Sequence, residues 1–160
     1  MNAEDKQTAS PAKKSSPFST IALIAFAIVA GILVQESTSM PESAVNWGKD
    51  LKVALAASGA ESKPILLNFT SRGCQYCVQM EKEVIVQDDI KSTIEKYIPV
   101  KLDAFDNKEA SARYDIYALP AYVIVDANGK KLAMVDGFQP AGRFKEFLDK
   151  GLVIAQTKTQ

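Results

Sequence analysis

The chain has 160 residues, of which 47% are apolar and 24% are charged, a balance typical of a globular protein rather than a disordered one. Nineteen basic and nineteen acidic residues cancel, so there is no basic field that would bind nucleic acid. The absence of histidine removes the commonest metal ligand and the commonest acid–base catalyst.

The N-terminal region divides into a polar tail, an apolar run and a polar linker. Residues 1–17 are polar, contain three lysines and predict a disordered cytoplasmic tail. Residues 18–34 carry no charge, and a helix of this length would rise about 25 Å, at the short end of what spans a bilayer. Residues 35–43 predict a linker to a domain at 44–160.

Two interpretations of the apolar run stay open. A cleaved signal peptide has a shorter apolar core and a small-x-small cleavage site, for which Ser37-Thr38-Ser39 would be a poor match. We favour a transmembrane signal anchor, because the run is long and no Ala-x-Ala follows it. The three lysines before the run, with Glu36 and Glu42 after it, then predict a single-pass protein of the bacterial inner membrane whose C-terminal domain lies in the periplasm.

The rest of the chain alternates helical and strand patterns. In chain order we expect a helix at 42–58, a strand at 64–69, a long helix at 74–94, a strand at 98–102, a short helix at 107–114, strands at 121–125 and 131–135, and a last helix from near Pro140 to Leu152. Asn-Gly within 126–129 predicts a hairpin turn. This order predicts an α/β fold in which helices flank a mixed central sheet on both faces.

The two cysteines of the chain, Cys74 and Cys77, lie at the start of the expected long helix. Free N–H groups and the positive end of the helix dipole favour a thiolate at Cys74, and Arg72 adds positive charge nearby. A spacing of three residues places both sulfurs on one helix face, close enough to form a disulfide. Cys74 could therefore attack another disulfide, and Cys77 could resolve the mixed disulfide.

Two other roles for this pair are less consistent with the sequence. Zinc takes four ligands, so a zinc site here would need a second chain or unusual carboxylates. A structural disulfide that closes so short a loop would add little stability. We therefore expect a redox-active pair that needs neither a metal ion nor a cofactor.

Beyond the cysteines, residues 62–152 resemble the thioredoxin superfamily. The resemblance rests on the strand ILLNF before the pair, on Tyr114-Asp115-Ile116 followed by Leu119-Pro120, on the hairpin AYVIVDANGKKL and on the tail GFQPAGRFKEFL. It implies a thioredoxin fold in which a cis proline lies beside the cysteines and its neighbour receives the substrate chain. The residues expected to contact a substrate are Leu119, Pro120, Gln75 and Tyr76.

The segment CQYCVQMEKEV resembles the C-terminal periplasmic domain of the interchange protein DsbD and its small membrane-anchored relatives. Those proteins mostly pass electrons outward to other disulfides. The resemblance implies a protein-disulfide reductase for exported proteins, supplied by an upstream thiol electron donor. A thiol oxidase or disulfide isomerase with the same residues stays open, and a Cu(I) carrier that adds Met80 to the thiolates is a further alternative.

The residues around the cysteines depart from the usual family pattern. Gly73 stands where the family usually has tryptophan, and Gln75-Tyr76 separates the cysteines in place of Gly-Pro or Pro-His. The redox potential therefore cannot be copied from thioredoxin or DsbA. The absence of a histidine between the cysteines favours a reducing potential.

The proton that Cys77 must lose needs an acceptor. The family's usual buried aspartate is Asn68 here, which cannot titrate. Glu81 lies four residues after Cys77, the offset at which the DsbD domain also has a glutamate, so we expect Glu81 to be the acid–base group. Lys101, on the next strand, would be the cation that moderates the effect of burial. The alternative is a Glu81 that reaches solvent or pairs with a surface lysine.

Overall fold

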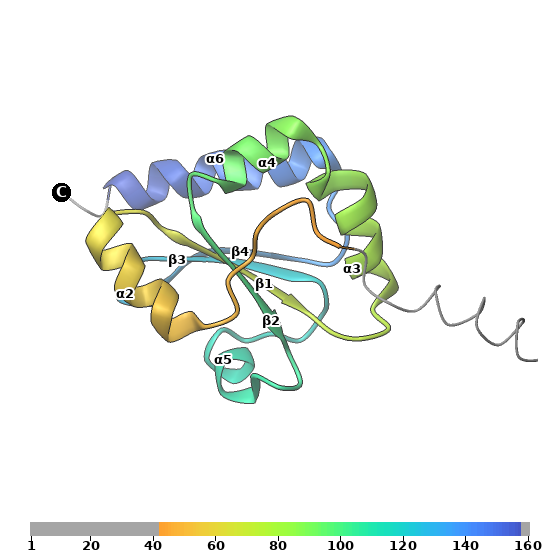
Figure 1. Ribbon diagram of the computed structural model, residues 1–160, viewed down its shortest axis with the longest axis horizontal. Helices are drawn as coiled ribbons and strands as arrows, with labels where there is room; N and C mark the ends of the chain where they lie inside the picture. Colours follow the sequence, from red (N-terminus) through yellow and green to blue (C-terminus); the bar gives the residue numbers. More distant parts are fainter. Residues whose placement is uncertain (1–41, 158–160) are drawn as a thin grey trace, which may run out of the picture. The chain divides into compact units, whose positions relative to one another are not determined.

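The computed structural model describes residues 42–157 (Figure 1). The predicted tail, the transmembrane anchor at 18–34 and nearly all of the linker lie outside the described residues. Within residues 42–157, no helix combines the length and the apolar character needed to cross a membrane.

A mixed sheet of four strands, in the order β2-β1-β3-β4, forms the centre of the described domain. β1 (Ile65–Thr70) runs parallel to β2 (Ile98–Asp103) and antiparallel to β3 (Ala121–Val125), which pairs antiparallel with β4 (Lys131–Asp136). Every residue of β1 and β3 is buried, as expected for central strands composed mainly of aliphatic and aromatic side chains.

Helices cover both faces of this sheet, and each face has its own apolar cluster. Figure 1 shows α4 and α6 together on one side of the strands and α2 and α5 on the other. The helices are α2 (Leu51–Glu61), α3 (Gln75–Gln79), the π-helix η1 (Met80–Ile85), α4 (Asp88–Ile94), α5 (Lys108–Arg113) and α6 (Ala141–Thr157). The predicted order of elements and the mixed sheet with helices on both faces are confirmed.

The first helix is shorter than the prediction of 42–58, which is wrong over its first half. α2 begins at Leu51, because the carboxylate of Asp50 caps it and accepts hydrogen bonds from two backbone N–H groups of the first turn. α2 also extends three residues beyond Ser58, to Glu61.

Residues 42–50, which we call the strap, run along the edge of the sheet in place of the predicted helix. Gly48 forms a parallel bridge with Val100 of β2, and its N–H donates to the carbonyl of Pro99 at 2.9 Å. Val45 is buried in the apolar cluster that contains α4 and α6. Val45 is therefore buried without a helix, whereas the later apolar positions, Leu51 and Leu55, lie in α2.

The long helix predicted at 74–94 is divided into two pieces. α3 and η1 follow one another from Gln75 to Ile85, and the backbone of Gln87 is extended before α4 begins at Asp88. Acidic residues in the first turn of α4 interact favourably with the helix dipole and support a new start there. π-helical segments are rare and often occur at functional sites, and this one carries Glu81.

The C-terminal half follows the predicted pattern closely. The hairpin turn is confirmed, since the N–H of Gly129 donates to the carbonyl of Asp126 at 2.9 Å. Gly129 has a φ of +72°, a conformation that favours glycine, and a Cβ at this position would also displace the guanidinium of Arg113, 2.8 Å away. α6 continues five residues past the predicted end at Leu152, to Thr157.

Candidate active site

Cys74 and Cys77 are joined by a disulfide at the start of α3, with their Cα atoms 5.3 Å apart. Cys74 is the N-cap residue, and its Sγ accepts a hydrogen bond from the backbone N–H of Cys77 at 3.2 Å. Cys74 is half-buried, whereas Cys77 is only 3% exposed. The more accessible sulfur is therefore the one that faces a backbone donor, which favours a thiolate when the pair is reduced.

The loop between β1 and Cys74 explains one departure from the family pattern. Gly73 has a φ of +77°, a conformation that residues with a side chain rarely adopt. The N–H of Cys74 donates to the carbonyl of Ser71 at 3.3 Å and closes the turn. Arg72 is exposed directly before Gly73, so its charge lies at the surface that leads to the disulfide.

The Leu119–Pro120 peptide bond is cis, as predicted. Because Ala121 pairs with Phe69 in the antiparallel β1–β3 ladder, Pro120 lies at the end of β1 that leads toward Cys74. The substrate-binding roles of Leu119, Pro120, Gln75 and Tyr76 stay predictions. Gln75 and Tyr76 are both exposed, whereas Pro120 is buried and Leu119 is half-buried.

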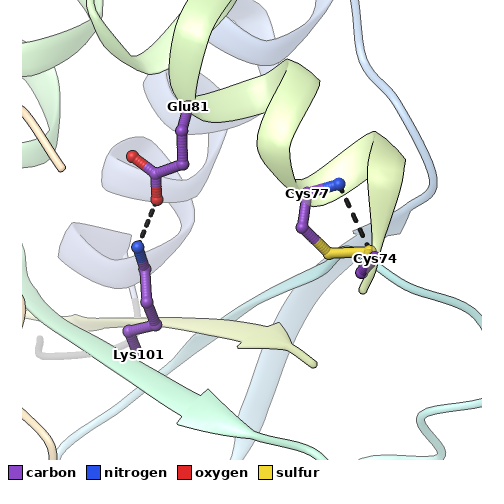
Figure 2. Close-up of a disulfide and its surroundings, with 4 residues drawn as sticks. All are labelled: Cys74, Cys77, Glu81 and Lys101. Carbon is purple, nitrogen blue, oxygen red and sulfur yellow. Dashed lines mark hydrogen bonds and ion pairs between the residues drawn. A yellow bond between two sulfur atoms is a disulfide. The ribbon is translucent and has the colours of Figure 1, made fainter. Parts of the chain in front are cut away.

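Glu81 is buried and forms an ion pair with Lys101 of β2 (Figure 2). The side chain of Glu81 is 2% exposed and that of Lys101 is 21% exposed, so the interpretation of Glu81 as a solvent-facing residue is wrong. Figure 2 shows Glu81 directed toward Lys101 while Cys77 faces Cys74. Within residues 42–157 no hydrogen bond joins Glu81 to either cysteine, and the acid–base role of Glu81 stays a prediction.

Asn68 lies in register between Lys101 on β2 and Tyr122 on β3. It is fully buried, and its Oδ1 has no hydrogen-bond partner among the residues that the structure describes. Burial, and then the negative charge of Glu81, raise the pKa of Tyr122 well above its usual value. Lys101, Asn68 and Tyr122 thus form a row of polar residues across three neighbouring strands, and Lys101 pairs with Glu81.

The sequence analysis missed two residues that contact this pair. The hydroxyl of Ser43 donates to Glu81 Oε2 at 2.6 Å, and the indole Nε1 of Trp47 donates to Ser43 Oγ at 2.8 Å. Ser43 was assigned to a linker and Trp47 to a helix. The one available signal was that Trp47 is the single tryptophan of the chain, since a partly buried indole N–H usually finds a partner.

No group of three His, Cys, Asp or Glu side chains in the described part of the chain could hold a metal ion. Met80, the residue considered as a partner for Cu(I), is fully buried. Its sulfur accepts a hydrogen bond from the backbone N–H of Gln139 at 3.3 Å, so it is already engaged in the core.

A central mixed sheet with a Cys-x-x-Cys disulfide at a helix N-terminus and a cis proline at the same end of β1 defines a thiol:disulfide oxidoreductase of the thioredoxin fold. Residues 51–152 match the family model of the thioredoxin-like domain, and the chain belongs to this family. The predicted membership of the thioredoxin superfamily is confirmed.

Two relatives of this chain have names that describe thiol–disulfide chemistry. The chain is 29% identical over 122 residues to the disulfide bond reductase DsbH of Chlamydia pneumoniae. The match covers 68% of this chain and 72% of that protein. It is 23% identical over 141 residues to the thiol:disulfide interchange protein DsbD of Ralstonia nicotianae, which covers 81% of this chain. The chain spans only 23% of the length of that DsbD.

A solved structure of a DsbH oxidoreductase is similar to this fold, with a TM-score of 0.60 at 20% identity. The match covers 91% of this chain and 95% of that one. At this identity the likeness shows the fold alone, and it agrees with the architecture described above.

Proposed function

We propose that this protein reduces disulfides of exported proteins through Cys74 and Cys77. The thiolate of Cys74 attacks a substrate disulfide, which breaks the substrate S–S bond, forms a mixed disulfide and releases the first substrate thiol. Cys77 then loses its proton and attacks Cys74 Sγ, which releases the second substrate thiol and forms the Cys74–Cys77 disulfide. Two electrons pass from the pair to the substrate, and an upstream thiol donor returns them.

The observation that carries this proposal is the difference between the two sulfurs. Cys74 is accessible and accepts the N–H of Cys77, whereas Cys77 is buried behind it. An accessible sulfur stabilised as a thiolate suits the attack, and a buried thiol protected from other reagents suits the resolution. The name of one relative, a disulfide bond reductase, supports the reductive direction.

Glu81 is the proposed acceptor of the Cys77 proton. It is the buried carboxylate that follows Cys77 by one helical turn, and Asn68 cannot take over this role. Since no hydrogen bond joins Glu81 to Cys77 within the described residues, a water molecule would carry the proton between them.

The direct test uses single cysteine variants with insulin as the substrate. Cys74→Ser should abolish reduction, whereas Cys77→Ser should accumulate a mixed disulfide through Cys74 that can be isolated under non-reducing conditions. A Cys74→Ser/Cys77→Ser variant that keeps full reductase activity would refute the proposal.

We also propose that residues 18–34 anchor the protein in the inner membrane, with the redox domain in the periplasm. The uncharged run and the lysines before it support this orientation. In spheroplasts, the intact chain should remain with the membrane and residues 43–160 should be digested by external protease. A soluble mature protein that begins near Met40 would show that the run is a cleaved signal instead.

A further inference from the structure

The strap brings a serine hydroxyl directly onto the buried carboxylate of Glu81. Ser43 Oγ lies 2.6 Å from Glu81 Oε2, while Lys101 Nζ is bonded to the other oxygen, Oε1. Both oxygens of Glu81 therefore have a donor. The two donors come from different parts of the chain, the strap and β2.

The remaining hydrogen bonds of Ser43 fix the direction of its hydroxyl. Ser43 Oγ accepts from the indole Nε1 of Trp47 at 2.8 Å and from the backbone N–H of Val45 at 3.3 Å. A hydroxyl has one hydrogen and two lone pairs, and both lone pairs are occupied by these donors. The single hydrogen of Ser43 must therefore point to Glu81, and Ser43 cannot accept a proton from Glu81 without losing a contact.

Trp47 also links the strap to Lys101. The ammonium of Lys101 lies 5.6 Å from the centroid of the Trp47 ring, within the range of a cation–π interaction. Ser43, Trp47 and Lys101, which lie around Glu81, also line one pocket of about 900 Å³. The partners of Glu81 thus reach the surface although Glu81 itself is buried.

Resting on the proposed role of Glu81, we propose that Ser43, oriented by Trp47, is a positioning residue that holds Glu81 as a carboxylate ready to accept the Cys77 proton. A hydroxyl that can only donate stabilises the ionised acid and disfavours the protonated one. Ser43 does not touch the reacting sulfurs, so its effect is confined to the step in which Cys77 is deprotonated.

The other charged groups near Glu81 are few. β2 contributes Lys101 and β3 contributes Tyr122, while Lys82 and Glu83 on η1 itself are exposed. α4 and α6, which also pack against η1, contribute the apolar side chains Ile90, Ile94, Phe144 and Leu148 to this cluster. Further charged residues, Glu42, Lys49, Asp103 and Asp106, line the same pocket as Ser43 and Lys101.

The test follows both chemical steps in one experiment. The reduced full-length protein in detergent is mixed with one equivalent of Ellman's disulfide, which releases one coloured thiolate when Cys74 attacks and a second when Cys77 resolves. The two phases are recorded from pH 5.5 to 9 for the wild type and for the variants Ser43→Ala, Ser43→Thr, Trp47→Phe and Glu81→Gln. Ser111→Ala is the matched control, since Ser111 is equally half-buried but donates to the carbonyl of Ala104.

Ser43→Ala should slow the second phase by up to about tenfold and leave the first phase unchanged. Ser43→Thr should restore the wild-type rate, Trp47→Phe should slow the second phase to a smaller extent, and Ser111→Ala should leave both phases unchanged. If Ser43→Ala does not fold, the rate of the second phase in Trp47→Phe alone tests the role of Ser43.

The result that overturns the inference is a second phase at the wild-type rate in Ser43→Ala, or in Trp47→Phe if the alanine variant does not fold, while Glu81→Gln slows that phase. The role of Glu81 would then stand without Ser43. If Glu81→Gln itself keeps the wild-type profile, the proton role of Glu81 fails and that of Ser43 fails with it. The trapping of a mixed disulfide by Cys77→Ser is independent of both results.

Discussion

Glu81 on η1 and Lys101 on β2 form an ion pair at the buried face of the sheet (Figure 2). The carboxylate is almost fully enclosed, and the ammonium keeps partial contact with solvent. A charge in such a place is tolerated because its partner and the Ser43 hydroxyl satisfy it. Loss of one partner of the pair should therefore lower the stability of the fold as well as affect the proposed proton transfer.

Lys101→Met should destabilise the protein by about 3 kcal/mol, because it leaves the carboxylate of Glu81 buried without its counter-charge. Chemical denaturation at pH 7 measures the effect. The double variant Lys101→Met/Glu81→Gln should recover much of this loss, since it removes both charges.

The matched control for this variant is Lys145→Met. Lys145 forms an exposed ion pair with Asp149 on α6, and such pairs contribute less than about 1 kcal/mol. Equal losses in Lys101→Met and Lys145→Met would show that the Glu81–Lys101 pair contributes no more than a surface pair.

The sheet could be predicted from the sequence because its signals are local. The apolar runs of β1 and β3 and the Asn-Gly turn predict three strands, and the predicted bounds differ from the observed ones by at most one residue. The first half of the helix predicted at 42–58 was wrong because Val45 was counted among the apolar positions of the helix, whereas it packs in the core from the strap. Asp50, a good N-cap residue, was the overlooked signal for the true start.

The candidate site was only partly accessible to the same reasoning. Cys74, Cys77 and Glu81 lie within one segment, so spacing alone relates them, and strand order brings Lys101 near. Ser43 and Trp47 come from a segment held by contacts with distant residues, among them the bridge between Gly48 and Val100 and the burial of Val45, which no local sequence pattern predicts. The π-helical turn that carries Glu81 was likewise not predicted by any sequence motif.

Gly151 of α6 is buried where the helix meets the sheet. A Cβ added there would contact the Ile124 side chain and lie 2.7 Å from the Tyr97 hydroxyl, which donates to the Leu148 carbonyl. Gly151→Ala should therefore destabilise the protein by about 1–3 kcal/mol in thermal or chemical unfolding, through overpacking.

Gly142, near the start of the same helix, provides the control. A Cβ at Gly142 meets nothing within 4 Å, so Gly142→Ala should stabilise by about 0.5 kcal/mol through helix propensity. A Gly151→Ala variant as stable as Gly142→Ala would contradict the close packing of α6 on β3.

Stability should fall in alkaline solution because three tyrosines, Tyr97, Tyr114 and Tyr122, are buried as neutral phenols. Burial raises the pKa of Tyr114. Burial, and then the charge of Asp149, raise the pKa of Tyr97, and burial followed by the charge of Glu81 raises that of Tyr122. The pKa of each buried tyrosine is higher in the folded than in the unfolded state. The stabilisation by these neutral phenols is therefore complete below about pH 10, the pKa of an unfolded tyrosine, and is lost as the pH rises above it.

Each such group should lower the free energy of unfolding by about 1 kcal/mol at pH 11. Urea unfolding between pH 9 and 11.5 measures the slope, and Tyr122→Phe should reduce it whereas Tyr117→Phe, at a position 90% exposed, should not. A free energy of unfolding that stays constant from pH 9 to 11 would contradict the burial of these phenols.

The equilibrium of the Cys74–Cys77 couple with glutathione tests most directly whether this protein reduces disulfides. Reference dithiols range from about −270 mV for thioredoxin to about −120 mV for DsbA. We expect the couple to lie near the thioredoxin end, so that the dithiol remains a donor of electrons to substrate disulfides. A value near that of DsbA would identify a thiol oxidase and contradict the proposed function.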